Sequence, residues 1–397
     1  MNETIAFYKD KIFKEIEDLG PSVIALSDWM ADNPELSGNE FAITRKVIDI
    51  LESHGFDTEE NFCGIKTAFR GSIKNKGATR IAYLMEYDAL PDIGHGCGHN
   101  VSGCTSLLAS IAFSKVKEAI DGELVLVGTP DEEAKCAKVE LADKKAFDEY
   151  DFAMMIHMYN DNMVVKKFVA LDAVEFTFTG KPSHAGTCPW LGVNALNGAQ
   201  LFFHAVDMLR QHVKPDVRMH GVILEGGIGP TPNIVPDKAV VRFHFRSHTR
   251  KYLDQVVKKV MDCASGAAIA TQTDVTYKYF EPKADEMVRN TAAEKMVEDV
   301  YNELGIQIDQ ADETETISSD IFRVSQKCPA IHSYLSICDR SIDLHTKEFA
   351  RATKSDRAHK AIVNGAKILV MSALNVFHNQ GIKDNIRAEF DKVVKPT

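Results

Sequence analysis

The chain of 397 residues lacks a long apolar run and a block of basic residues interleaved with aromatic ones. Its start, MNETIAFYKDKIFKEIEDLG, is charged throughout and has no apolar centre of the kind a secretory signal needs. No later segment approaches the apolar length that spans a bilayer, so we expect no membrane partner. The net charge of −11 and the missing basic patch exclude nucleic acid as a partner. These absences predict a cytoplasmic protein.

Cysteine is sparse and irregularly spaced. The eight cysteines are scattered over a long chain without a secretory signal, so a disulfide framework is not expected. Hydrophobic residues make up 45% and charged residues 26% of the chain, which is typical of a folded globular protein. The length is sufficient for two domains. We therefore expect a folded enzyme or binding protein.

Apolar periodicity predicts alternating helices and strands in the first part of the chain. A helix is expected at 4–19, which Gly20-Pro21 should end, and another at 41–54. A strand at 80–87 precedes a helix at 104–120, a strand at 122–129, a short helix at 144–150 and a strand at 152–157. This alternation predicts an α/β layer with a mainly parallel sheet, in which ligands bind beyond the carboxyl ends of the strands.

The pattern changes near Leu171. From there to Phe280 the expected elements follow the order β-α-β-β-α-β, which is the split βαβ order of a ferredoxin-like domain. After Pro282 the α/β pattern returns. We therefore predict one domain formed by residues 1–171 and 284–397, with a second domain inserted at residues 172–283.

The stretch GHGCGHN places Cys97 and His99 one residue apart among glycines. Thiolate and imidazole are good ligands for zinc and related divalent ions, and glycines let the backbone approach a metal without Cβ clashes. Taken alone, this short motif leaves an incidental polar turn as the alternative.

Neighbouring carboxylates, Glu132 and Glu133, follow the apolar strand at 122–129. Adjacent side chains in extended backbone point in different directions, so one carboxylate can bind a metal while the other reaches the metal's water. A solvated acidic loop is the alternative. His157, at the end of a strand, and His345, before a predicted helix, are each open to an alternative as hydrogen-bonded structural histidines. We expect the groups that follow strands to meet at one sheet edge.

Six motifs in order carry a resemblance that extends over nearly the whole chain. They are EYDALPDIGHGCGHN, GTPDEEA, IHMYN, SHAGTCPWLGVNAL, GGIGPTPNIVPDKA and LHTKEFARA. The sequence thereby resembles the M20 metallopeptidases and, within them, the amidohydrolase subfamily with the group of peptidase M20 domain-containing protein 2 and aminobenzoyl-glutamate hydrolase. The resemblance implies an M20-type zinc peptidase fold, a mixed-sheet α/β catalytic domain with an inserted ferredoxin-like lid and dimerisation domain.

A site for two divalent metal ions, zinc or manganese with cobalt as a further fit, is implied by this resemblance. Cys97 matches the bridging ligand, His99 and His157 match ligands of one metal, and Glu133 and His345 match ligands of the other.

The resemblance also implies roles for five further residues. Asp88 matches the aspartate that orients a metal ligand, and Glu132 matches the general base. His220 matches a lid histidine that reaches the active site of a neighbouring subunit. Asn233 and Arg246 match contacts to the substrate, and a guanidinium is suited to a two-point grip on a carboxylate.

The implied activity is metal-dependent hydrolysis of the amide in an N-acyl amino acid, an aminobenzoyl-glutamate-like compound or a dipeptide, by a homodimer that associates through its lid domain. The segment Ala134–Lys138 departs from the glycine-rich continuation usual in the family, so we expect a differently shaped or charged loop beside the site. A catalytically silent binding protein and a hydrolase with Cys97 as nucleophile are the alternatives.

Overall fold

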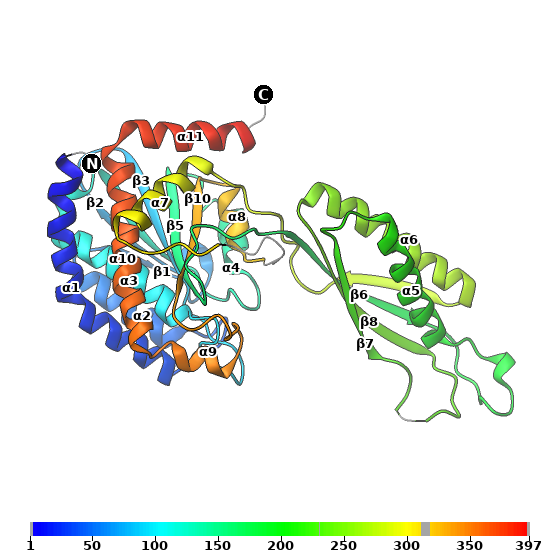
Figure 1. Ribbon diagram of the computed structural model, residues 1–397. Helices are drawn as coiled ribbons and strands as arrows, with labels where there is room; N and C mark the ends of the chain where they lie inside the picture. Colours follow the sequence, from blue (N-terminus) through cyan, green and yellow to red (C-terminus); the bar gives the residue numbers. More distant parts are fainter. Residues whose placement is uncertain (1–2, 230, 311–317, 395–397) are drawn as a thin grey trace. The chain divides into compact units, whose positions relative to one another are not determined.

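Two compact units make up the computed structural model, which describes residues 3–229, 231–310 and 318–394 (Figure 1). The main unit contains the described residues up to Lys167, those at 287–310 and those from Ser319 onward. The inserted unit contains the described residues from Phe168 to Glu286, together with Ser318. The inserted domain expected from the sequence spans residues 172–283.

The main unit is built on a six-stranded mixed sheet in the order β1-β2-β4-β3-β5-β10. The pairs β4–β3, β3–β5 and β5–β10 are parallel, whereas β2 is antiparallel to both β1 and β4. The strands are β1 (Asp57–Glu60), β2 (Phe69–Lys74), β3 (Thr79–Met85), β4 (Gly122–Gly128), β5 (Phe152–Tyr159) and β10 (Ala330–Ser336). The parallel strands are buried along nearly their whole length, as strands covered on both faces are. The predicted mixed-sheet α/β fold is confirmed.

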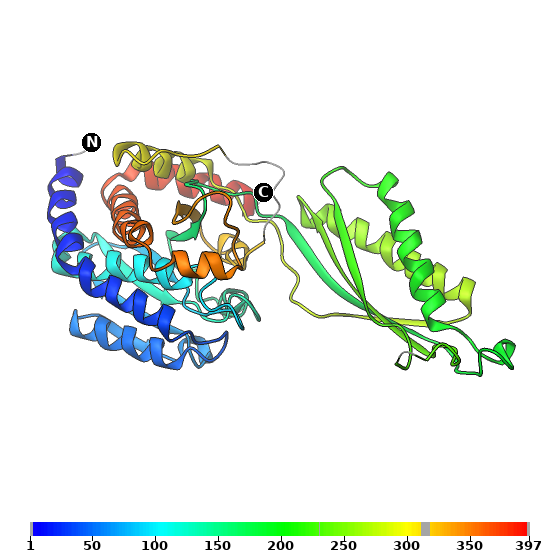
Figure 2. The same cartoon turned by 60° about the horizontal axis from the view of Figure 1, so that its bottom comes forward.

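Helices enclose this sheet. α3 (His99–Lys115) and α10 (Asp356–His378) pack on β3 and β5, and α1 (Glu3–Asp32) packs against both helices (Figure 2). The remaining helices of the main unit are α2 (Phe41–Ser53), α4 (Ala137–Asp143), α7 (Thr291–Glu303), α8 (Ile321–Ser325), α9 (Lys347–Ala352) and α11 (Gln380–Val394), with short 3₁₀ helices at Phe62–Gly64 and Lys117–Ala119.

Helix α1 runs through Gly20-Pro21, so the expected helix end at Leu19 is wrong. Its buried residues recur at intervals of three or four on both sides of the proline, and they include Ile12, Ile16, Gly20, Val23 and Ser27. One continuous stripe therefore faces α3 and α10. Proline removes one backbone hydrogen bond, and burial of the second half of the helix outweighs that loss.

Two other helix boundaries also differ from the expectation. Residues 144–149 form turns where a helix at 144–150 was expected, and the short helix α4 precedes them. Lys145 has φ of 66°, a left-handed conformation that a helix does not continue through. Helix α3 begins at His99 rather than Cys104, directly after Gly98 with φ of 81°. His99 therefore lies in the first turn of α3.

Helix α10 is long and apolar enough to cross a membrane by length and composition, so the expectation that no segment approaches this limit is wrong. However, 72% of its apolar window is buried inside the protein, where it packs against α1, α3 and β5. The core helix of a soluble protein meets the same criteria, so α10 is weak evidence for a membrane span.

The inserted unit consists of a four-stranded antiparallel sheet with two long helices on one face (Figures 1 and 2). The strand order is β7-β8-β6-β9, and the chain order is β-α-β-β-α-β, as expected from the sequence. The elements are β6 (Ala170–Thr179), α5 (Ala195–Leu209), β7 (Arg218–Glu225), β8 (Lys238–Ser247), α6 (Arg250–Thr271) and β9 (Asp274–Tyr279), with 3₁₀ helices at Pro189–Leu191 and Arg210–His212. Buried phenylalanines of β6 and β8 pack against α5 and α6.

Arg250 ties the start of α6 to the beginning of the inserted unit's sheet. Its Nη1 lies 2.8 Å from Oδ1 of Asp172, a fully buried carboxylate, and its Nε lies 2.9 Å from Oδ1 of Asp285. Its Nη2 donates to the carbonyl oxygens of Leu171 and Ala284. One guanidinium thus satisfies groups on two segments, 171–172 and 284–285.

Replacing Arg250 by Met should destabilise the inserted unit by about 3–5 kcal/mol, because the Asp172 carboxylate stays buried without its main partner. Lys283, 3.7 Å from Asp172, can compensate only in part. The double variant Arg250→Met/Asp172→Asn should recover much of the loss, since no buried charge remains. Urea unfolding followed by circular dichroism measures both effects. A loss under about 1 kcal/mol in the single variant would contradict this account.

Candidate active site

The carboxyl ends of β3, β4, β5 and β10 lie at one edge of the main sheet because these strands are parallel. Asp88 follows β3, Glu132 and Glu133 follow β4, His157 lies near the end of β5, and His345 follows β10 in the loop before α9. With Cys97 and His99 at the start of α3, the structure brings seven of the ten predicted site residues together at this edge.

The turn that carries Cys97 and His99 is held closely against the sheet. A Cβ atom on Gly103 would lie 2.2 Å from the carbonyl oxygen of Glu86, so only glycine lets α3 approach the end of β3 this closely. The backbone N–H of His345 donates to the carbonyl of Gly96 at 2.9 Å. The loop after β10 is thereby fastened to the same turn.

Two groups of potential metal ligands share Cys97. The first consists of Cys97, His99 and His157, and the second of Cys97, Glu133 and His345; in each, the ligand atoms lie within 4.8 Å of one another. Sγ of Cys97 is 3.6 Å from Nε2 of His157, and Oε1 of Glu133 is 3.5 Å from Nε2 of His345. Sulfur, nitrogen and carboxylate oxygen in such groups suit zinc and similar ions.

Asp88 connects the two groups. Its Oδ1 lies 2.9 Å from Nδ1 of His99, and its Oδ2 accepts from the hydroxyl of Ser37 at 2.8 Å and from the backbone N–H of Glu133 at 3.0 Å. A proton on Nδ1 leaves the Nε2 lone pair of His99 directed into the site. This contact fits the orienting role that the resemblance implies for Asp88.

Buried polar atoms at the site have no hydrogen-bond partner among the described residues. They include Oε2 of Glu86, Nε2 of His99 and Oε1 of Glu133. Such atoms are normally paired, so they call for a further group. Five carboxylates gather here around the buried ammonium of Lys138, and they are those of Glu86, Asp88, Glu132, Glu133 and Asp320. The donor set and its negative charge therefore fit divalent cations.

This negative charge shifts the pKa values of the site. Burial would lower the pKa of His99, but Asp88, Cys97 and Glu86 hold it well above its usual range. Burial, then the charges of Asp320 and Glu86, raise the pKa of Glu132 well above its usual range.

The Cys97 thiol has a pKa raised well above its usual range, first by burial and then by Glu133. A nucleophilic cysteine needs a lowered pKa, so this environment does not support Cys97 as a nucleophile.

His220, Asn233 and Arg246 lie in the inserted unit. His220 on β7 pairs with His244 on β8, and Arg246 lies two residues further along β8. The side chains of His220, His244 and Arg246 therefore lie on one face of the sheet, the face that α5 and α6 do not cover. Burial, then the charge of Arg246, lower the pKa of His220. Asn233 is exposed in the loop after β7, where its carbonyl accepts from the N–H of Ala185 at 2.8 Å.

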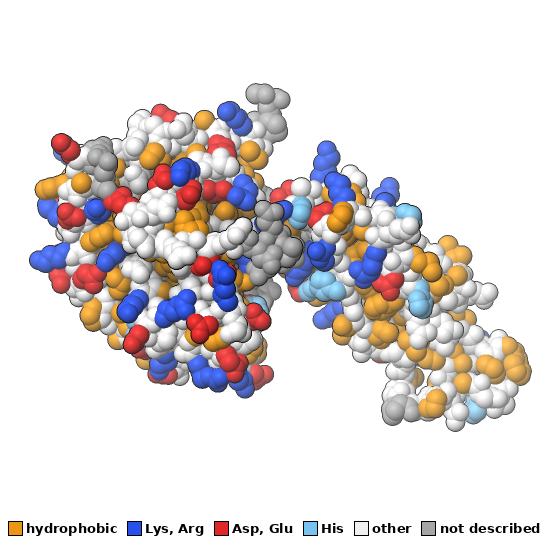
Figure 3. All heavy atoms as spheres, viewed as in Figure 1, with side chains coloured by type: hydrophobic (Ala, Val, Ile, Leu, Met, Phe, Trp, Pro, Cys, Tyr) orange, Lys and Arg blue, Asp and Glu red, His pale blue; other side chains and the backbone are white. Residues whose placement is uncertain are grey.

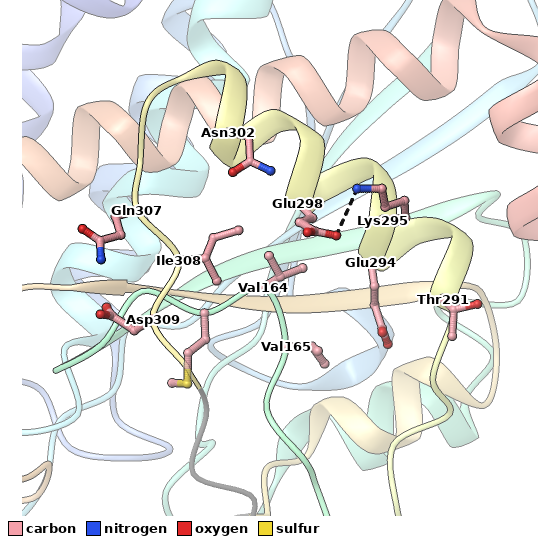
Figure 4. A pocket seen from close by; sticks show the side chains of 11 residues that line it. Val164, Val165, Thr291, Glu294, Lys295, Glu298, Asn302, Gln307, Ile308 and Asp309 are labelled. Carbon is pink, nitrogen blue, oxygen red and sulfur yellow. Dashed lines mark hydrogen bonds and ion pairs between the residues drawn. The ribbon is translucent and has the colours of Figure 1, made fainter.

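The main unit contains a cavity of about 630 Å³ (Figure 4). Val164, Val165 and Ile308 contribute its apolar lining, and side chains of α7 such as Glu298 and Lys295 form an ion pair at its edge. None of the ten predicted site residues lines it, and it contains neither histidine nor cysteine. The cavity therefore lacks the imidazole and thiolate ligands that the candidate metal site contains.

Sequence reasoning missed four residues of the site. Glu86 directly follows an apolar strand, the same signal that drew attention to Asp88, and Lys138 lies in the segment that departs from the family pattern. Ser37 and Asp320 carry no comparable signal, because they are brought to the site only by the packing of distant segments.

Comparison with known proteins agrees with the two units. Residues 171–271 match the family model of the peptidase dimerisation domain. The Xaa-Arg dipeptidase of Mus musculus is 31% identical over 403 residues, which cover 96% of this chain and 92% of that protein. The chain belongs to the M20 family of metal-dependent peptidases and amidohydrolases.

Other M20 relatives are similar over most of their length. One of the subunits of the p-aminobenzoyl-glutamate hydrolase of Escherichia coli K12 is 24% identical, with 93% of this chain and 92% of that protein covered. The YXEP protein of Bacillus subtilis, described as a dinuclear metal-binding peptidase of the M20 family, has the same fold with a TM-score of 0.72, at 16% identity and 91% and 99% coverage. The predicted metal-dependent amidohydrolase of the M20 family is confirmed.

Replacing Asp88 by Asn should weaken metal binding by about 10–100-fold, because the neutral amide no longer orients and polarises His99. Titration of the metal-free protein against a chelator of known affinity measures the change. The Ser37→Ala variant is the matched control, since it removes one contact of Asp88 but leaves the charge; its effect should be smaller. Unchanged affinity in the Asp88→Asn variant would argue against the orienting role.

Proposed function

We propose that this protein is a cytoplasmic, homodimeric amidohydrolase with two divalent metal ions in each subunit, zinc or manganese with cobalt as a further fit. Among its substrates we place dipeptides with a C-terminal arginine first, because the 31% identical relative is an Xaa-Arg dipeptidase. N-acyl amino acids and aminobenzoyl-glutamate-like compounds are the other members of the proposed class. The eight free cysteines support a reducing compartment.

The observation that carries this proposal is the pair of ligand groups joined at Cys97. A thiolate common to both groups is suited to bridge two ions, while His99 with His157 and Glu133 with His345 complete the separate sets. The general base Glu132 adjoins these groups, since its carboxylate lies within 4.8 Å of the ligand atoms of His99 and Glu133.

When bound, two divalent ions supply a water of lowered pKa and a polarised amide carbonyl. Glu132 accepts the proton of the attacking water and returns it to the departing amine. Asp88 maintains the orientation of His99 during the reaction.

The proposed substrate contacts come from the inserted unit. Arg246 offers a two-point grip for the free carboxylate of the substrate, with Asn233 as a further polar contact. His220 supplies a donor for the oxyanion that forms at the scissile carbonyl. Support for this assignment is the position of His220 and Arg246 on one open sheet face.

Replacing Glu132 by Gln should lower kcat by about 10²–10⁴-fold, because the amide cannot carry the proton. Metal content should stay at the native value, since the five proposed ligands are unchanged. Release of free amine from Xaa-Arg dipeptides, N-acyl amino acids and aminobenzoyl-glutamate measures turnover, and elemental analysis measures the metal. Glu140→Gln on α4, an exposed glutamate, is the matched control. Native turnover in the Glu132→Gln variant would refute the assignment.

Support for the homodimer comes from an exposed apolar edge of the inserted unit. Of the sixteen large hydrophobic side chains that are exposed in the described residues, twelve lie in this unit, and Figure 3 shows hydrophobic side chains gathered on its visible face. Val222 and Leu224 on β7 are 57% and 52% exposed at an edge strand. An unpaired apolar edge is suited to pair with a second copy.

A Val222→Lys variant should therefore shift the protein from dimer to monomer, because it places a charge in the proposed interface. Sedimentation velocity measures the mass of both forms. Ile269→Lys on α6, at a position 80% exposed, is the control and should stay dimeric. A native monomer, or a dimer that Val222→Lys leaves intact, would contradict the β7 interface.

A further inference from the structure

The buried side chain of Lys138 lies directly behind the candidate metal site. Its Nζ is 2.6 Å from Oε1 of Glu86 and 2.6 Å from Oδ1 of Asp320, and its backbone N–H donates to Oδ2 of Asp320 at 3.0 Å. All three side chains are at most 1% exposed. Lys138 lies in the first turn of α4. This helix packs against α8, which begins directly after Asp320.

The carboxylates around this ammonium are spaced like the ligands of a metal ion. Glu86, Glu132 and Asp320 each offer an oxygen, and these oxygens lie within 4.8 Å of one another. Oxygen-rich groups of this kind suit Mg²⁺ or Mn²⁺. Two of the three carboxylates instead accept hydrogen bonds from Lys138, so the positive charge at this place comes from the chain itself.

Glu86 joins this cluster to the proposed metal ligands. While its Oε1 accepts from Lys138, its Oε2 is completely buried and has no hydrogen-bond partner among the described residues. Oε2 lies 3.5 Å from Nε2 of His99 and 3.9 Å from Nε2 of His157. One carboxylate therefore faces the internal cation with one oxygen and the first ligand group with the other.

We propose that Lys138 is a built-in third cation of the active site: its ammonium occupies a potential third metal position among Glu86, Glu132 and Asp320 and so limits the centre to two ions. This inference rests on the proposed function, because it presupposes the two metal ions.

The test is the number of Mn²⁺ ions bound per chain in the full-length protein. Native protein and the Lys138→Ala variant are saturated with Mn²⁺, freed of excess ion by gel filtration and analysed for manganese. The smaller alanine leaves room for an ion, so Lys138→Ala should bind three ions where the native protein binds two. Lys138→Ala/Asp320→Asn, which lacks one of the three carboxylates, should return to two.

Each remaining outcome has a defined meaning. Two ions in both the native protein and Lys138→Ala would overturn the inference and leave the proposed function intact. No bound manganese and no hydrolysis in the native protein would contradict the proposed function itself. Lys138→Ala could fail to fold, so it is prepared throughout in saturating Mn²⁺. Failure to fold even there, while the uncharged Lys138→Met/Glu86→Gln/Asp320→Asn variant folds, would also overturn the inference.

Discussion

The main unit has to accommodate several carboxylates beside the buried imidazoles of His99 and His157 and the thiol of Cys97. Four of these carboxylates follow strands that end at the same sheet edge: Glu86 and Asp88 follow β3, and Glu132 and Glu133 follow β4. Little water is available there to solvate Glu86 and Asp88, which are buried. Buried charges of one sign are costly unless cations or hydrogen bonds compensate them. Lys138 supplies one such cation, and the buried polar atoms without a hydrogen-bond partner among the described residues include atoms of Glu86, His99 and Glu133.

The surrounding fold keeps these groups in place with little freedom. Gly103 allows α3 to lie against the end of β3, and the hydrogen bond from His345 to Gly96 fastens the last loop to the first. His345 itself has φ of 61°, a left-handed conformation that costs a residue with a Cβ of order 1–3 kcal/mol. The backbone hydrogen bond to Gly96 holds this conformation, and Nε2 of the imidazole lies 3.5 Å from Oε1 of Glu133.

Much of this arrangement could be predicted from the sequence, and the exceptions have physical reasons. The parallel strands β3, β4 and β5 are marked by mostly apolar runs, and the residues that follow β3 and β4 therefore indicate the site. Rules that read helix ends and membrane spans from local sequence failed where tertiary packing decided the outcome. Pro21 lies inside α1 because the buried stripe of this helix continues past it. Helix α10 is apolar because it is buried in the core. Asp320 is brought to Lys138 by the packing of α8 on α4, which no local pattern encodes.

Under the proposed function, the thiolate of Cys97 would hold both metal ions, because it belongs to both ligand groups. X-ray absorption spectroscopy at the zinc edge of the zinc-loaded native protein tests it most directly. The account predicts one sulfur neighbour at about 2.3 Å for each zinc and a second zinc at about 3.5–4 Å, with the sulfur signal lost in a Cys97→Ser variant. A zinc environment of only nitrogen and oxygen, or a single isolated ion, would contradict it.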